Sequence, residues 1–174
     1  MMKRISHFFL LLPFLLLLSG FFWSDPTWDQ VNETIDHKYP SVKNIDVNDL
    51  QTSLARGESF ILVDVRETEE FAVSHLPSAI NIITPAAIKY PKDTAIVVYC
   101  SVGVRSAEFA EKLGDLGFSG VRNLRGSIFA WGNKGYPLMR GDTAVHAVHP
   151  YNEKWGKLLN PALHRYRVEP EKDR

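Results

Sequence analysis

The sequence contains a single cysteine, and it has no excess of charge of either sign. One cysteine cannot form an intramolecular disulfide, and zinc sites built on two or four cysteines are excluded with it. Lys and Arg together number 20, as do Asp and Glu, so the formal net charge is zero. Nucleic-acid binding without regard to base sequence needs many basic contacts to phosphates. We therefore expect no nucleic-acid partner.

The chain has 174 residues, of which 45% are hydrophobic and 23% are charged. This is the composition of a folded globular protein and not of a disordered one. The length suffices for one ordinary domain with an extension, and rarely for two domains. The apolar residues are unevenly spread, because nearly every residue from 8 to 23 is apolar.

That apolar segment follows Lys3 and Arg4, which is the pattern of a secretory signal. It is short for a membrane-spanning helix, which needs roughly 20 apolar residues, and Pro13 interrupts it. Basic residues ahead of such a segment place the following chain outside the cytoplasm. We expect residues 1–23 to be a signal peptide or a signal anchor, with cleavage left open. The protein would then be exported, either periplasmic or anchored to the membrane facing the periplasm, with membrane contact only through this segment. The alternative is a buried core helix.

Residues 24–44 are polar, contain Pro26 and Pro40, and follow no clear period, so we expect a linker or a loosely packed lead-in. From residue 45 onward, short apolar runs alternate with stretches of helical spacing. The expected strands are 60–65, 79–82, 94–99 and 121–124, and the expected helices are 47–54, 67–73 and 106–116. This alternation predicts an α/β domain with a parallel sheet of about five strands and helices on both faces.

The single cysteine, Cys100, lies at the end of the strongest predicted strand, and a predicted helix follows it. In open α/β sheets, ligands bind beyond the carboxyl ends of the strands. Gly103 can adopt a positive φ that turns loop amides inward, and such amides at a helix N-terminus favour an anion. The thiolate of Cys100 would be that anion, with Arg105 as a fixed positive charge nearby, so Cys100 is a candidate nucleophile. The alternative is an inert buried cysteine.

Five short motifs follow one another in order between residues 45 and 138. They are Asp64-Val65-Arg66-Glu67-x-x-Glu70-Phe71, His75-Leu76-Pro77-Ser78-Ala79-Ile80-Asn81-Ile82, the loop from Cys100 to Ser106, Leu113-x-x-Leu116-Gly117-Phe118, and Leu124-x-Gly126-x-Ile128-x-Ala130-Trp131 with Gly135-Tyr136-Pro137-Leu138. Together they resemble the rhodanese (sulfurtransferase) family in its single-domain form. The resemblance predicts a rhodanese domain over 45–138, with 139–174 as a C-terminal extension. Ser74, Ser78 and Ser127 stand where the family usually has glycine, and we expect them only to adjust local turns.

The resemblance implies that Cys100 attacks the outer sulfur of a donor, holds it as a persulfide and passes it to an acceptor. The implied donor is a thiosulfate-like or mercaptopyruvate-like small molecule, and the acceptor is cyanide or a thiol, including a protein thiol. No cofactor and no metal are implied. The residues expected to bind substrate are Ser101, Val102, Gly103, Val104, Arg105 and Ser106. Asp64 and Arg66 are expected to support the site, with Asp64 as an orienting or capping group near the loop and Arg66 forming a structural ion pair with Glu70.

Other functions compete with this interpretation. A phosphatase of the same fold needs five residues between its cysteine and arginine, whereas four residues separate Cys100 from Arg105. A non-catalytic rhodanese-like module of the cell envelope, which binds a partner or senses a persulfide, is the main alternative, although the intact Cys100 favours an enzyme. In the extension, His146 and His149 could form half of a metal site, but no third ligand is evident nearby. The side chains expected to pack the extension onto the domain are Tyr151, Trp155, Leu158 and Leu159.

Overall fold

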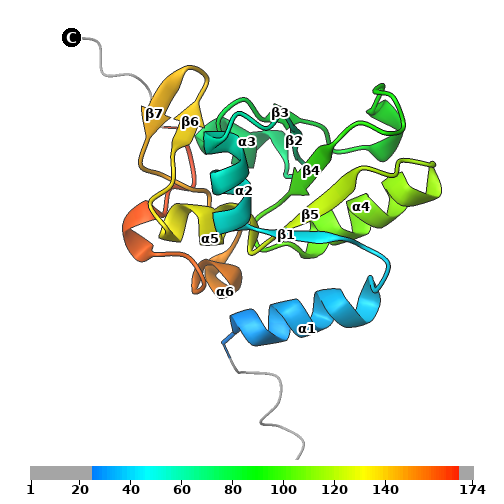
Figure 1. Cartoon of the computed structure of the whole chain (residues 1–174). Coiled ribbons are helices and arrows are strands. Elements are labelled where there is room, and N and C mark those ends of the chain that lie inside the picture. Colours follow the sequence, from blue (N-terminus) through cyan, green and yellow to red (C-terminus); the bar gives the residue numbers. More distant parts are fainter. Residues whose placement is uncertain (1–24, 169–174) are drawn as a thin grey trace, which may run out of the picture.

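The computed structural model describes residues 25–168 and is shown in Figure 1. The expected signal segment, 1–23, lies outside the described residues, so export stays a prediction. Within 25–168, no helix is both long and apolar enough to cross a membrane.

A five-stranded parallel sheet forms the centre of the molecule, in the order β1-β5-β4-β2-β3. Its strands are β1 (Asn44–Asp46), β2 (Ile61–Asp64), β3 (Ile80–Asn81), β4 (Ile96–Tyr99) and β5 (Val121–Arg125). All four residues of β4 are buried. A strand covered on both faces reads as a continuous apolar run without alternation, which is the pattern seen in this part of the sequence. The predicted parallel α/β sheet is confirmed.

Helices cover both faces of this sheet (Figure 1). Successive residues of a strand point to opposite faces, so β4 divides its side chains between two core clusters. Val97 and Tyr99 pack with α2 (Val47–Ala55) and α5 (Ser127–Asn133), whereas Ile96 and Val98 pack with α4 (Val104–Asp115). Two short elements, the helix α3 (Thr68–Val73) and the 3-10 turn η1 (Pro85–Ala87), lie between the strands β2 and β4.

The described residues of the expected linker, 25–44, are not a linker, because they contain the helix α1 (Trp28–Lys38). A capping box between Thr27 and Gln30 starts it. Val31 and Ile35 lie one helical turn apart and are both buried in the core shared with α2 and α5. Two buried positions among polar residues make a stripe too narrow to be recognised as helical spacing, so the helix could not be predicted from a hydrophobic period.

The C-terminal segment folds back onto the same domain. It contains the hairpin β6 (Leu138–Arg140) and β7 (Thr143–Val145), the short helix α6 (Glu153–Gly156) and the 3-10 turn η2 (Pro161–Leu163). Val148, Leu159 and Leu163 are buried in the core cluster that includes α5, and Trp155 packs against that cluster half-buried. Tyr151 remains 44% exposed. The described part of the extension is therefore a packed component of the domain.

Ile35 anchors α1, so we expect Ile35→Ala to lower the free energy of unfolding by about 2–5 kcal/mol. The matched control is Glu33→Ala, an exposed position on the same helix, which should change that free energy by less than about 0.5 kcal/mol. Urea unfolding of the three proteins measures both values. If the two variants were equally stable, α1 would be a loosely held lead-in after all.

Candidate active site

Cys100 directly follows β4, and the short loop after it leads into α4 at the carboxyl end of the sheet. Its side chain is almost completely buried, and its Sγ accepts a hydrogen bond from the Gly103 amide at 3.2 Å. The Ser106 hydroxyl lies 3.5 Å from the same sulfur. Gly103 has a φ of 114°, and a Cβ there would come within 3.1 Å of Ile35 Cδ1. Glycine is therefore needed both for the backbone conformation and for the close approach of α1.

The N-terminus of α5 binds the other side of the Cys100 loop. The Ile128 amide donates to the Cys100 carbonyl at 3.2 Å, and the Phe129 amide donates to the Ser101 carbonyl at 3.1 Å. The first amides of a helix have no acceptor within the helix, so they are free to donate to these carbonyls. With both carbonyls held by α5, the loop keeps its Gly103 amide directed at the sulfur.

Ser127 completes this anchor. Its hydroxyl accepts a hydrogen bond from the Cys100 amide at 3.1 Å and donates one to the Leu124 carbonyl at 3.0 Å. Its φ of 50° lies in the left-handed region, which explains why a glycine also suits the position. The sequence interpretation treated Ser127 as a local adjustment of a turn. The structure instead shows that Ser127 forms a bridge to Cys100, 27 residues earlier in the chain.

Two asparagine side chains, one buried and one half-buried, hold Ser106 in a chain of hydrogen bonds. Its hydroxyl donates to Asn123 Oδ1 at 2.6 Å, and Asn123 Nδ2 donates to Asn44 Oδ1 at 3.0 Å. A hydroxyl has one proton to donate, and Ser106 uses it in its shortest contact, the one to Asn123. Ser106 is thereby fixed in orientation beside the sulfur. Neither asparagine was identified from the sequence, because each belongs to a short strand and has no motif around it.

Asp64 and Arg66 form an ion pair that is fully buried at the end of β2. Arg66 Nη2 lies 2.7 Å from Asp64 Oδ2, and it also donates to the Ser74 carbonyl at 2.6 Å. The expected pairing of Arg66 with Glu70 is wrong. Arg66 precedes Glu67, the N-cap of α3, so helical spacing does not direct its side chain to Glu70. A buried carboxylate requires a partner, and the nearby Asp64 takes this guanidinium instead.

Glu70 pairs with Arg105, which crosses from α4 to α3. Both guanidinium nitrogens lie 2.9 Å from the two carboxylate oxygens, and Ser101 Oγ donates to Glu70 Oε1 at 3.0 Å while accepting from Arg105 at 2.9 Å. Burial acts to raise the pKa of Glu70, but the hydrogen bonds and charge of Arg105 outweigh it and lower that pKa. The positive charge expected beside Cys100 is therefore matched by a carboxylate.

A pocket of about 150 Å³ opens beside Cys100. Its walls come from the Cys100 loop, from Arg105 and from two aromatic residues of the C-terminal segment, Tyr151 and Trp155. The expected substrate-binding residues thus separate into two groups. Gly103 and Ser106 contact the sulfur itself. The pocket walls contain the others, which are Ser101, Val102, Val104 and Arg105.

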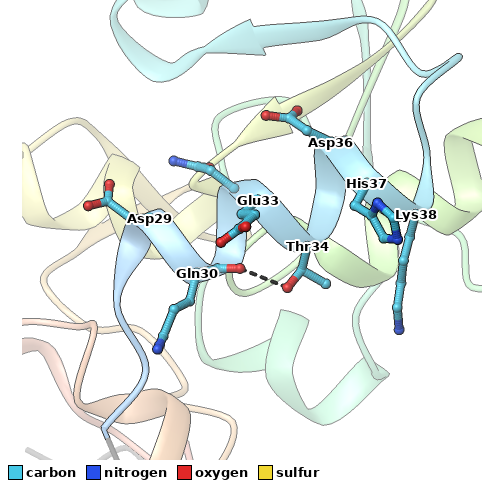
Figure 2. A pocket seen from close by; sticks show the side chains of 8 residues that line it. Asp29, Gln30, Glu33, Thr34, Asp36, His37 and Lys38 are labelled. Atoms are coloured by element: carbon cyan, nitrogen blue, oxygen red, sulfur yellow. Dashed lines mark hydrogen bonds between the residues drawn. The ribbon is translucent and has the colours of Figure 1, made fainter.

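A larger hollow, of about 920 Å³, lies along α1 (Figure 2). The described residues that line it all belong to the one helix and are polar or charged, with Thr34 Oγ1 donating to the Gln30 carbonyl. We assign no chemistry to it. No group of three or more His, Cys, Asp or Glu within 25–168 could hold a metal ion. The Nδ1 atom of His149 accepts a hydrogen bond from the Tyr151 amide, so it has a structural partner.

Comparison with known proteins supports one family. The model of the rhodanese-like domain matches residues 46–134. A protein named sulfurtransferase from Allochromatium vinosum is 36% identical over 102 residues, which cover 56% of this chain and 95% of that protein. The putative sulfurtransferase YtwF of Bacillus subtilis is 33% identical over 94 residues, covering 52% and 90%. A crystal structure of a rhodanese-like domain protein from Staphylococcus aureus, 31% identical, superposes with a TM-score of 0.51 over 56% of this chain and 97% of that one.

We expect Ser127→Ala to lower the free energy of unfolding by about 1–3 kcal/mol, because it leaves the buried Cys100 amide without an acceptor. Ser127→Gly should also be less stable than the parent, because it lacks the hydroxyl, although glycine removes the strain of the positive φ. The exposed Ser59→Ala is the control, with a change below about 0.5 kcal/mol. Urea unfolding measures all three. A Ser127→Gly protein as stable as the parent would show that the hydroxyl bridge contributes nothing.

The pair of Glu70 and Arg105 should make stability depend on pH. Because the pKa of Glu70 is lowered on folding, its contribution is complete above its unfolded pKa of about 4.3 and is lost as the pH falls toward the folded pKa. Glu70→Gln should cost about 1–3 kcal/mol at neutral pH, and this difference from the parent should shrink below that unfolded pKa. Urea unfolding from pH 7 to pH 3 measures it, with the exposed Glu69→Gln as control. A difference independent of pH would contradict the lowered pKa.

Proposed function

The chain belongs to the rhodanese-like family of sulfurtransferases, and on that premise we propose that it transfers a sulfane sulfur through a persulfide on Cys100. The observation that carries this proposal is the placement of Cys100. Its sulfur lies at the carboxyl end of the central strand, accepts a hydrogen bond from the Gly103 amide and borders a pocket. A nucleophile in a parallel α/β sheet is commonly placed at this edge.

In the first half-reaction, the Cys100 thiolate attacks the outer sulfur of the donor. The bond between the transferred sulfur and the rest of the donor breaks, which is an S–S bond in thiosulfate and a C–S bond in a mercaptopyruvate-type donor. Its electron pair leaves with the remainder of the donor, as sulfite or as the enolate of pyruvate, while the transferred sulfur stays on Cys100. In the second half-reaction, cyanide or a thiolate attacks that outer sulfur, and the Cys100 thiolate is released. The Gly103 amide supports the negative charge on Sγ before and after transfer, because it already donates to that atom.

Arg105 acts in this proposal mainly through position. Its guanidinium is held by Glu70 and Ser101, so it fixes the outer edge of the loop and carries little uncompensated charge. Asp64 and Arg66 support the site from further away, because they hold the end of β2 and the turn at Ser74.

The competing function is a non-catalytic module that binds a partner or senses a persulfide. A persulfide sensor would also accept sulfur on Cys100, whereas a partner-binding module need not, and neither would pass the sulfur on repeatedly. Multiple turnover therefore separates the two functions.

Incubation with thiosulfate or a mercaptopyruvate-type donor should add the mass of one sulfur atom to the intact protein. Cyanide should remove this mass and form thiocyanate over many cycles, and Cys100→Ser should lose both the adduct and the turnover. Because the chain has one cysteine, the adduct can be assigned without digestion. The control is Ser59→Ala, which should behave as the parent. Thiocyanate formation by Cys100→Ser at the parental rate would exclude Cys100, and a single uptake of sulfur without turnover would indicate the sensing module.

A further inference from the structure

Part of the wall of the Cys100 pocket comes from the C-terminal segment, beyond the region that matches the family. The Tyr151 ring lies over the Arg105 guanidinium, 4.7 Å from Cζ to the ring centre. Tyr151 is held there with a φ of 64°, and its amide donates to His149 Nδ1 at 3.1 Å. Asn152 caps the next turn by accepting from the Trp155 amide at 3.0 Å. These contacts hold both aromatic residues at the pocket.

The pocket offers little net positive charge. Among the described residues that line it, Arg105 is the one basic side chain, and Glu70 neutralises its charge with two hydrogen bonds of 2.9 Å. Burial lowers the pKa of the neighbouring His149, against the opposing charge of Glu70, so that ring is neutral at neutral pH. A dianion that enters this space must give up its hydration for one compensated guanidinium, which is unfavourable.

The size and chemistry of the walls favour an apolar group. Val102, Val104, Tyr151 and Trp155 supply the uncharged part of the lining. The volume of about 150 Å³ is comparable to that of an apolar protein cavity known to hold benzene.

We propose that this pocket selects an organic sulfur donor that carries one uncharged apolar group of about the size of benzene, in preference to dianionic thiosulfate, with Tyr151 as the specificity-determining residue. The proposal rests on the proposed function, because it names the substrate class of the same site. It also gives the C-terminal segment a part in the reaction, as a wall of the pocket.

Three donors test the proposal: benzenethiosulfonate, methanethiosulfonate and thiosulfate. In each case, the Cys100 thiolate attacks the terminal sulfur, the bond between the two sulfurs breaks, and sulfinate or sulfite leaves with the electron pair. The terminal sulfur remains on Cys100 as the persulfide anion, so no oxidant or reductant is needed. The benzene and methane compounds differ in the apolar group, and thiosulfate differs from both in charge.

The measurement is kcat/KM for thiocyanate formation with cyanide, together with the rate of persulfide formation by quenched-flow mass spectrometry. Each rate is divided by that of the same donor with free cysteine, which removes differences in intrinsic reactivity. We expect this normalised kcat/KM to be about tenfold or more higher for benzenethiosulfonate than for methanethiosulfonate. We expect it to be higher for methanethiosulfonate than for thiosulfate. Tyr151→Ala should bring the benzene-to-methane ratio close to one, whereas Tyr151→Phe should preserve it.

The control is Tyr90→Ala, which removes another exposed tyrosine that does not appear among the described residues lining this pocket. It should keep the parental ratio. A second arm uses Glu70→Gln, which removes the carboxylate that neutralises Arg105. This variant should raise the normalised kcat/KM for thiosulfate relative to that for benzenethiosulfonate.

Absence of a persulfide with all three donors would overturn the proposed function, and the specificity with it. Persulfide formation from all three, with a benzene-to-methane ratio near one or a ratio that Tyr151→Ala does not change, would overturn the specificity alone. In that case the sulfurtransferase function would stand.

Discussion

The seating of the Cys100 loop on the N-terminus of α5 is the interaction on which the site depends. Two backbone hydrogen bonds hold the carbonyls of Cys100 and Ser101, and the Ser127 hydroxyl holds the Cys100 amide. A free loop of a few residues has many accessible conformations, and these three hydrogen bonds hold the Cys100 loop in a single conformation. The sheet supplies one side of this arrangement through β4, and the core shared by α1, α2 and the C-terminal segment holds α5 against it.

The polar groups around the loop are paired with one another, and few of them face the pocket. Glu70, Arg105 and Ser101 satisfy each other, and so do Ser106, Asn123 and Asn44. Such closed networks fix geometry because a partly satisfied buried network is costly. They also leave the space in front of the sulfur to valine and aromatic side chains, and this contrast between a polar scaffold and an apolar mouth distinguishes the site.

The parts of the fold that depend on local pattern could be predicted from the sequence. The apolar run at 94–99 indicated the central strand, and Gly103 indicated the turn into α4. Contacts between distant segments could not be predicted in this way. Ser127 serves a residue 27 positions away, and α1 buries only Val31 and Ile35, so neither leaves a periodic trace. The partner of Arg66 could not be predicted either, because Glu70 is taken by Arg105 from 35 residues further along the chain.

The position of β1 in the sheet has a consequence for how the molecule is made. Asn44 pairs with Asn123 in a parallel register, so this edge of the sheet can form only after some eighty intervening residues have been synthesised. The helix that seats the cysteine follows β5 directly, and it too arrives late. A growing chain therefore carries Cys100 without the hydrogen bonds from α5 that hold its loop, and the proposed sulfur transfer requires α5 to be in place first.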